Sequence, residues 1–580
     1  MPRSPRAPIF VAFARLAFVT AFVVTGAAAE AQVTVGPNVN MGGGPAVFSP
    51  PSTIIGDPFL QRQNEPSIAV SSRNPCHLLA GANDYRAVDL EEAAGEVGDA
   101  WLGVFKSFDC GATWTSTLLP GHRLDTSAAG LASPIKGLAA AADPTVRAGT
   151  SGLFYYSGIA FNRGDGEIGK VFVARFIDNN NKDGGDPIEY AGTTQIETGT
   201  AGQFLDKPWI VADVPRGDLT CVVNGRTVAA GAAYLVYTSF VGGDNNVHSK
   251  IMFSRSTDCG ATWSNPAKLS ERVAKNQGTT IAIDPGTGDI HIAWREFATA
   301  GDSTSRNSIL VAKSTDGGKS FTKAAAIFPS FSPFDQASSP LTFRTNAYPT
   351  LVVVPAEAEG RAAGQPGRVY LAWSARGFGG ARPNDARVVV STSIGGASWS
   401  NPKPADSFTG SGHQIMPAMA FAGGKIALAY YDLRSDRSGG FEDLVMEYGY
   451  AAYEQCLASN GALGFNQVFL CMLTHPDGLQ RRHTLDMRAA MADALCLANG
   501  ACGFASTSVL GGSSQVSRYI EGRATVDGPR SQLQYNRPNL PIFSRGRFPF
   551  IGDYIDIGGQ NFVATNNGAW AWDTGQTPHP

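Results

Sequence analysis

Charged and phenolic side chains recur at the ends of short apolar segments along this chain. Several arginines converging on one point could clamp an anionic ligand, because a guanidinium binds a carboxylate through two parallel hydrogen bonds. The candidate ligand-binding residues are Arg86, Arg295, Arg376 and Arg434. The carboxylates and tyrosines at equivalent places are Glu65, Asp84, Asp143, Glu296, Tyr85, Tyr348 and Tyr554. The alternative is that these charges form structural salt bridges around a common axis.

A repeated motif indicates the turns that would position these residues. It reads KSFDCGATWTS from Lys106, SRSTDCGATWS from Ser254, AKSTDGGKSFT from Ala312 and, in a worn form, VSTSIGGASWS from Val390. Its Asp can accept hydrogen bonds from backbone N–H groups, and the Gly two residues after the Asp can adopt positive φ. Its Trp would begin the next strand and pack against the sheet. We interpret the motif as a structural turn, carried by Asp109, Gly111, Trp114, Asp258, Gly260, Trp263, Asp316 and Gly318.

The motif belongs to a longer repeating unit of about 70 residues. Units begin with an apolar strand, often after a proline, as in NEPSIAV from Asn64 and DKPWIVAD from Asp206. A second strand often ends on an aromatic residue, a third leads into the motif, and a fourth follows it. Four short antiparallel strands repeated in series are typical of a β-propeller. Taking RFPFIGDYIDI from Arg547 as the last unit start, we expect an all-β propeller of seven blades, with six as the alternative.

The rest of the chain divides around these repeats. We expect the propeller to occupy residues 61–580, and residues 32–60 to supply outer strands that close the ring. The sixth unit loses its strand pattern over residues 435–482 and regains it near HTLDMRAAMAD. We therefore predict a partly helical insertion between the second and third strands of that unit.

The repeated motif, S-x-D-x-G-x-T-W, resembles the Asp-box, or bacterial neuraminidase repeat, of the sialidase superfamily. The resemblance covers residues 64–574 and implies a site in which three arginines hold the carboxylate of sialic acid. It implies Arg86, Arg295 and Arg434 in that role, with Arg376 in reserve. It implies a Tyr paired with a Glu as the nucleophile, from Tyr85, Tyr348 or Tyr554 and from Glu65 or Glu296. The acid would be Asp84 or Asp143. The family's Arg-Ile-Pro signature is absent here, so these roles rest on position alone.

The eight cysteines fit the same layout. Turns between first and second strands and turns between third and fourth strands lie on one side of an antiparallel blade. This places Cys76 beside Cys110, and Cys221 beside Cys259. We also predict a bond between Cys496 and Cys502, which leaves Cys456 and Cys471 for the insertion. Free buried thiols are the alternative.

The N-terminus reads as an export signal, with basic Arg3 and Arg6, an apolar run, and an Ala29–Ala31 cleavage site. We expect a secreted or periplasmic monomer without a membrane span. A net charge of −3 without long basic runs argues against a nucleic-acid partner. No Cys or His cluster has zinc-ligand spacing. Asp178–Asp186 loosely resembles a calcium loop, but Lys182 stands where a ligand is expected, so we interpret it as an ordinary polar turn, with a calcium site as the alternative.

Two functions fit these observations. The first is a secreted exo-glycoside hydrolase that removes a terminal sialic acid or another acidic sugar by a retaining route. The second is a non-catalytic propeller that binds a glycan or a protein at the same axial funnel. A complete set of arginines facing a Tyr–Glu pair would favour the enzyme, whereas mutually paired charges would favour the binding protein.

Overall fold

The computed structural model describes most of the repeat region and parts of the flanking chain. The described residues are 36, 39–43, 63–85, 91–92, 95–96, 100–162, 168–180, 185–242, 247–271, 273–299, 305–336, 344–379, 385–434, 486–503, 513–517, 524–525, 528–529 and 550–575. The predicted signal sequence, most of residues 32–60 and the whole 435–482 insertion lie outside this set. No helix among the described residues has the length and apolar character needed to span a bilayer.

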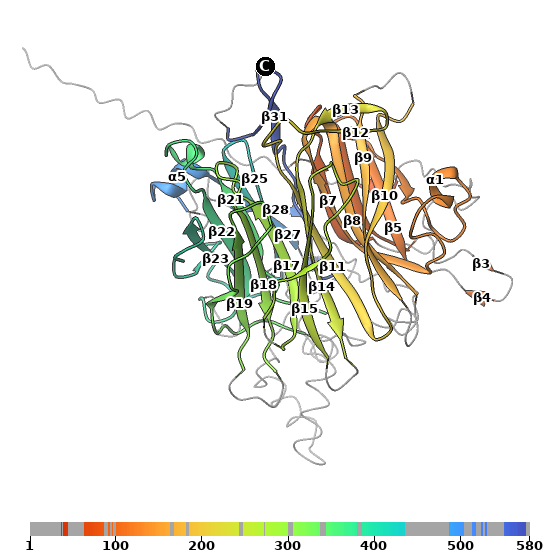
Figure 1. Cartoon of the computed structure of the whole chain (residues 1–580). Coiled ribbons are helices and arrows are strands. Elements are labelled where there is room, and N and C mark those ends of the chain that lie inside the picture. Colours follow the sequence, from red (N-terminus) through yellow and green to blue (C-terminus); the bar gives the residue numbers. More distant parts are fainter. Residues whose placement is uncertain are drawn as a thin grey trace, which may run out of the picture.

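Six four-stranded antiparallel sheets form the body of the molecule (Figure 1). Apart from short hairpins inserted between strands, the four strands of each sheet follow one another along the chain. The first three blades are β1 (Asn64–Val70), β2 (Leu78–Asp84), β5 (Trp101–Ser107) and β6 (Thr115–Leu118); β7 (Ala140–Ala148), β8 (Leu153–Phe161), β9 (Gly169–Asp178) and β10 (Ile188–Thr198); and β11 (Gln203–Ala212), β14 (Ala233–Val241), β15 (His248–Ser256) and β16 (Ala267–Lys268).

The remaining blades follow the same order. They are β17 (Asn276–Ile283), β18 (Ile290–Glu296), β19 (Ser308–Ser314) and β20 (Ala325–Phe328); β21 (Thr350–Val354), β22 (Arg368–Ala375), β23 (Arg387–Ile394) and β24 (Lys403–Pro404); and β25 (Gln414–Ala422), β26 (Lys425–Asp432), β27 (Asp486–Asp493) and β28 (Ser513–Ser517). The antiparallel pairing of β26 with β27 makes residues 433–485 the connection between the second and third strands.

Smaller elements decorate the blades. Four short hairpin pairs lie outside them or at the C-terminus: β3 (Glu91–Glu92) with β4 (Gly95–Glu96), β12 (Thr220–Val223) with β13 (Arg226–Ala229), β29 (Ala524–Thr525) with β30 (Gly528–Pro529), and β31 (Phe562–Ala564) with β32 (Trp570–Trp572). The described helices are short: α1 (Ala128–Leu131), α5 (Ala494–Ala498) and the 3-10 turns η1 (Met41–Gly43), η3 (Thr150–Gly152) and η4 (Ala356–Glu359).

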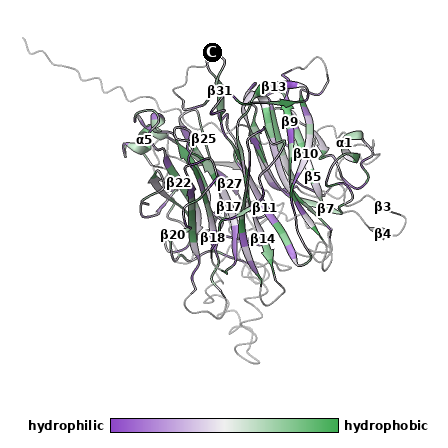
Figure 2. Ribbon diagram, in the orientation of Figure 1, coloured by the Kyte–Doolittle hydropathy of each residue, from purple (hydrophilic) through white to green (hydrophobic). Residues whose placement is uncertain are grey.

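The core lies mainly between neighbouring blades. Aromatic side chains of the second strands are almost fully buried: Tyr156, Tyr237, Trp294, Trp373 and Tyr430. Strands with aromatic and β-branched residues on both faces suit this arrangement, because each sheet packs against a neighbour on either side. Figure 2 shows hydrophobic residues concentrated along the strands of the body.

The expectation of seven blades is wrong and the alternative of six is right, because the described part of the last presumed unit pairs only as the two-stranded hairpin β31–β32 and forms no four-stranded sheet. Residues 550–561, here called the axial segment, have no strand assignment and no ladder partner. Ile555 packs with Ala418 and Ala429 of the sixth blade, and Ser67 of the first blade donates a hydrogen bond to Asp556 (2.6 Å). The axial segment therefore contacts both the sixth and the first blade, where a seventh blade was expected.

Two glycines let the axial segment approach other backbones closely. At Gly558 an added Cβ would lie 2.7 Å from the carbonyl oxygen of Ile68. At Gly552, where φ is +89°, it would lie 2.9 Å from the backbone nitrogen of Glu65. The sequence GDYIDI resembles a strand start, but its glycine and its acids serve close packing and polar contacts to several blades.

The repeated turns have the hydrogen bonds expected from their residue types. Asp109 accepts from the backbone N–H of Thr113 (2.9 Å) and from its hydroxyl (2.6 Å). Asp258 and Asp316 make the corresponding bonds to Thr262 and Ser320. The turn glycines Gly111, Gly260 and Gly318 all have positive φ. Satisfied acceptors in exposed turns account for the lowered pKa values of Asp109, to about 2, and of Asp258.

The predicted disulfides within the described residues are present. Cys76 is bonded to Cys110, Cys221 to Cys259, and Cys496 to Cys502. The first two bonds join the turn after an inner strand to the repeated turn of the same blade. Both kinds of turn therefore lie at one end of the propeller, and the starts of the inner strands lie at the other. Cys456 and Cys471 fall outside the described residues.

Candidate active site

A backbone bulge recurs at the start of the inner strands and aims side chains at the axis. The ladder is interrupted there in blades one, two, three, four and six. The bulged residues have positive φ: Glu65 (53°), Asp143 (60°), Lys207 (47°), Gly278 (70°) and Met416 (51°). Left-handed backbone is costly for residues other than glycine, and it persists where the surrounding structure imposes it, often at functional sites.

Three of these bulged side chains meet one residue of the axial segment. Lys207 Nζ lies 3.2 Å from Glu65 Oε1, 3.8 Å from Asp143 Oδ1 and 2.9 Å from Asp553 Oδ2. The carboxyl groups of Glu65 and Asp143 also perturb each other's pKa. We call Glu65, Asp143, Lys207 and Asp553 the axial cluster. All four side chains are buried, so their charges interact with little screening by solvent.

Asparagine and backbone groups fix the two bulged carboxyl groups. Asn83 Nδ2 donates to Glu65 Oε2 (2.8 Å), and Asn83 Oδ1 accepts from the backbone N–H of Asp143 (2.9 Å). Glu65 Oε1 accepts from the backbone N–H of Asp553 (2.9 Å), and Asp143 Oδ2 accepts from that of Lys207 (3.0 Å). The carboxyl groups are thus held by neighbours from the first and third blades and from the axial segment.

An arginine closes the outer side of the cluster. Arg344 binds Asp553 through two hydrogen bonds, of 2.8 Å from Nε and 2.5 Å from Nη2. Asn346 Nδ2 adds a third bond to Asp553 (3.2 Å). The Asp553 side chain is 1% exposed, whereas that of Arg344 is 42% exposed. Arg344 is therefore the side of this ion pair that solvent and ligands reach.

Two buried tyrosines flank the axial cluster. The hydroxyl of Tyr554 donates to the carbonyl oxygen of Pro144 (2.9 Å), and Lys207 Nζ lies 5.3 Å from the centre of its ring. The hydroxyl of Tyr348 donates to Gln277 Oε1 (2.8 Å). Burial raises the pKa of both phenols well above the usual value of 10. Both hydroxyls are consequently protonated near neutral pH.

The surroundings move the pKa values of the three carboxyl groups in different directions. Burial raises the pKa of Glu65 from 4.5 to about 8, against the opposing charge of Lys207. Burial likewise raises the pKa of Asp143, from 3.8 to about 6. Asp553 is also buried, but Lys207 and Arg344 together hold its pKa down at about 2. At pH 7 the cluster therefore contains a carboxylic acid beside two carboxylates, an arrangement suited to proton transfer.

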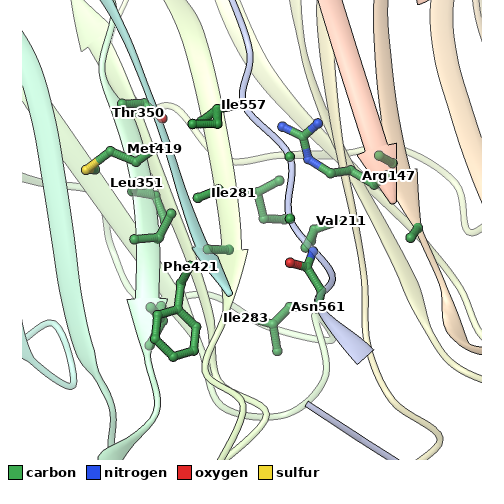
Figure 3. Close-up of a pocket in the computed structure, with 18 of the residues that line it drawn as sticks. Arg147, Val211, Ile281, Ile283, Thr350, Leu351, Met419, Phe421, Ile557 and Asn561 are labelled. Atoms are coloured by element: carbon green, nitrogen blue, oxygen red, sulfur yellow. The ribbon is translucent and has the colours of Figure 1, made fainter. Parts of the chain in front are cut away.

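The axis behind the cluster contains a small, mostly apolar cavity of about 100 Å³. Inner strands of all six blades and the axial segment line it, and Figure 3 shows Ile281, Leu351 and Phe421 facing it. Arg147 lies among the lining residues and binds Asp556 through Nη1 (2.6 Å) and Nη2 (3.2 Å). This ion pair ties the axial segment to the second blade beyond the axial cluster.

Of the sequence-predicted residues, Glu65 and Asp143 belong to the cluster, while Tyr348 and Tyr554 border it. Tyr85 is one contact away, because its hydroxyl accepts from Asn64 Nδ2 (2.8 Å). Asp84 is buried at the end of β2 and accepts from Gln63 (3.4 Å). Glu296 ends β18 opposite Asn276, and it takes no part in the cluster contacts given above. The catalytic roles of these residues remain predictions.

The described candidate arginines do not form a shared clamp. Arg295 binds Asp335 through two hydrogen bonds (2.7 and 2.5 Å) and lies over the ring of Phe297. Arg434 is paired with Asp432 and Asp406. Arg376 lies 5.5 Å from the ring centre of Phe334. The contacts of Arg295 and Arg434 follow the salt-bridge alternative, and Arg86 lies outside the described residues.

Sequence reasoning did not single out Lys207, Arg344 or Asp553 as partners in one site. One sequence feature could have pointed to Lys207: in the first three blades, a charged residue directly precedes the proline of the inner strand. Periodicity identified those prolines as unit starts and so placed the preceding residues near the axis, but it gave no indication that the backbone bulges there and brings three of them together. Asp553 depends on the path of the axial segment, which local pattern does not encode.

The segment Asp178–Asp186, interpreted from the sequence as a polar turn with calcium as the alternative, is only partly described. The carboxylate of Asp178 already accepts from Ser71 Oγ (2.6 Å) and from the backbone N–H of Asn180 (2.7 Å). Asp178 is also 3.0 Å from His77 Nδ1, and Asp186 is paired with Lys106. Residues 181–184 lie outside the described set. These contacts account for both ends of the segment as an ordinary polar connection.

Comparison with known proteins gives a remote structural likeness. No protein-family model and no curated protein matches the chain. The GH93 α-L-arabinofuranosidase of Fusarium graminearum, in complex with arabinobiose, is similar over 69% of this chain and 93% of that chain, at 17% identity and a TM-score of 0.36. Trypanosoma rangeli sialidase with the inhibitor DANA is similar over 74% and 63%, at 15% identity and 0.38. The chain thus resembles two solved glycosidases, and its own chemistry rests on its own residues.

Proposed function

We propose that this chain is a secreted glycoside hydrolase whose axial cluster performs acid–base chemistry on a glycan. The observation that carries the proposal is the convergence of Glu65 and Asp143, on strained bulges of two blades, with pKa values of about 8 and about 6. Glycoside hydrolysis needs one carboxyl group that keeps its proton and one that has lost it. The predicted N-terminal export signal and the three disulfides support a secreted location.

The groups take different roles in this proposal. Protonated Glu65 donates its proton to the glycosidic oxygen as the bond to the leaving group breaks. Ionised Asp143 accepts a proton from the attacking water, whose oxygen forms the new bond to the anomeric carbon. Asn83, bound to the Glu65 side chain and to the Asp143 backbone, is a positioning residue. Arg344 and Lys207 form the cationic side of the site, which suits an acidic sugar whose carboxylate competes with Asp553.

The test is hydrolysis of fluorogenic glycosides by the chain starting at Gln32. The panel contains a sialoside, an α-L-arabinofuranoside and a glucuronide. We expect turnover of at least one, reduced by about 100-fold or more in Glu65→Gln, because loss of a general acid typically costs that much. Glu296→Gln is the matched control, since it changes a buried strand-end carboxyl group outside the axial cluster. Equal rates in Glu65→Gln and the wild type would reject the assignment.

A non-catalytic glycan-binding propeller is the second candidate. The observation that favours it is that both cations, Lys207 and Arg344, are already paired with acids, and that Asp553 of the axial segment occupies the position between them. In that case no glycoside in the panel would be cleaved. A saccharide would instead bind the wild type, and Arg344→Ala would weaken that binding. Turnover of any glycoside that depends on Glu65 would decide for the enzyme.

A further inference from the structure

A second groove lies at the opposite end of the propeller from the axial cluster. It has a volume of about 740 Å³, against about 100 Å³ for the axial cavity. One wall is β13, all four residues of which line the groove, and the other is the turn Gly568–Trp570 between β31 and β32. Figure 1 shows β13 and β31 at the same end of the molecule. A groove of this size accommodates a ligand of several sugar units.

The described residues that line the groove carry positive charge only. Arg73 and Arg226 are the charged residues among them, and neither Asp nor Glu belongs to the lining. Both arginines are exposed. Arg73 is held in place, because its Nη1 donates to the carbonyl oxygen of Asp178 (3.2 Å). A guanidinium has five N–H donors, so this contact leaves others for a ligand.

The groove also contains a strained residue and a partly exposed aromatic ring. Ser151 has φ 60° and ψ 23°, a left-handed conformation that is unfavourable for serine. Arg73 packs against the neighbouring Gly152, where an added Cβ would lie 2.5 Å from Arg73 Cδ. Trp570 is half-buried and lines the opposite wall. The strained turn therefore supplies the Ser151 hydroxyl to the groove, and Gly152 leaves space for the Arg73 side chain.

We propose that this groove binds an anionic saccharide. Its carboxylate or sulfate groups pair with Arg73 and Arg226, and the face of a sugar ring stacks on Trp570. The remaining lining favours a saccharide over a peptide. It consists largely of small residues, such as Gly217, Ala229, Gly568 and Ala569, which form no deep apolar pockets for peptide side chains.

The test measures equilibrium binding of size-matched oligosaccharides to the chain starting at Gln32. The probes are a polygalacturonate oligomer for carboxylates, a heparin oligomer for sulfates, and a neutral dextran oligomer. We expect one-to-one binding of at least one anionic oligomer, weakened by added salt. Arg226→Ala and Trp570→Ala should each weaken it by about tenfold, which is the usual effect of one charge-assisted contact or one stacked ring.

Two controls separate this groove from the axial site. Arg306→Ala removes an exposed arginine from the loop before β19, at the other end of the blades, and should leave binding unchanged. Glu65→Gln should also leave it unchanged, so the result stands apart from the outcome for hydrolysis. Equal weakening by Arg306→Ala, equal binding of dextran, or no binding of either anionic oligomer would overturn the proposal. Preferential binding of a poly-glutamate peptide would overturn it in favour of a peptide ligand.

Discussion

At the scale of single residues, the axial cluster combines groups that oppose one another. Glu65 and Asp143 are carboxyl groups whose burial favours the protonated form, whereas Asp553 is kept ionised by two cations. A cluster optimised for stability alone would not bury two carboxyl groups around one lysine on strained backbone. The stability of the protein should therefore depend on pH in a direction set by Glu65 and Asp143.

We predict that stability falls as pH rises from about 5 to 8. In this window the folded chain retains protons on Glu65 and Asp143 that the unfolded chain has released, so raising the pH favours unfolding. Glu65→Gln cannot ionise at this position and should lose less stability than the wild type between pH 6 and 8. Urea unfolding midpoints at pH 5, 6.5 and 8 test this, and Glu296→Gln should keep the wild-type trend. A wild-type midpoint that rises with pH across this window would contradict it.

Arg295 illustrates a residue whose position suggested ligand binding but whose contacts are structural. Its side chain is buried and makes two hydrogen bonds to Asp335. Arg295→Ala should lower the free energy of unfolding by about 2 kcal/mol, because it leaves a partly buried carboxylate without its partner. Ligand binding per folded molecule should be unchanged. Arg306→Ala, which removes an exposed arginine, should change stability by less than about 0.5 kcal/mol. A loss of binding without a loss of stability in Arg295→Ala would restore its predicted role.

At the scale of elements, the axial segment joins the first and last blades. Hydrophobic clusters lie between successive blades, and Ile555 supplies the contact with the sixth blade. On the other side, Asp556 binds Ser67 and Arg147 of the first two blades. The axial segment thus serves as a connection between blades in addition to supplying Asp553 to the axial cluster.

Gly558 is the position where this connection should be most sensitive. Gly558→Ala places a methyl group 2.7 Å from the carbonyl oxygen of Ile68, a backbone atom that cannot move aside alone. We expect a loss of about 1–3 kcal/mol in the free energy of unfolding, as for overpacking elsewhere. Gly217→Ala is the matched control, because an added Cβ there has no neighbour within 4 Å. A denaturant titration that finds the two variants equally stable would show that the segment does not pack tightly against β1.

Local elements were predictable from the sequence, and long-range ones were not. The turns at Asp109, Asp258 and Asp316 follow from side chains that bond to their own backbone a few residues away. The Cys76–Cys110 and Cys221–Cys259 bonds follow once those turns are placed in a blade. The axial segment could not be derived in this way, because its path is set by partners in several blades hundreds of residues earlier in the chain.

The candidate site shows the same division. Glu65, Asp143 and Tyr348 were identifiable, because they precede inner strands whose starts must gather at the axis. The role of the arginines could not be predicted, since position at a strand end does not reveal whether an acid from a neighbouring loop already binds the guanidinium, as it does for Arg295 and Arg434. Asp335 and Asp406 are such acids.

At the scale of the whole molecule, the two ends of the propeller differ in chemistry. One end has disulfide-braced turns and the cationic groove with Arg73 and Arg226. The other has the axial cluster, with Arg344 as its solvent-facing residue. Under the two proposals above, the protein would hold an anionic glycan at one end and hydrolyse a glycan at the other.

The most direct test of the axial cluster as a catalytic centre is the pH dependence of kcat/KM for the best glycoside. The profile reports the ionisation of the free enzyme. We predict a bell-shaped curve, with an acidic limb near pH 6 as Asp143 takes up its proton and an alkaline limb near pH 8 as Glu65 loses its own. Glu65→Gln should abolish the activity that defines the curve. A profile that is flat from pH 5.5 to 8.5, or one that Glu65→Gln leaves intact, would contradict the assignment.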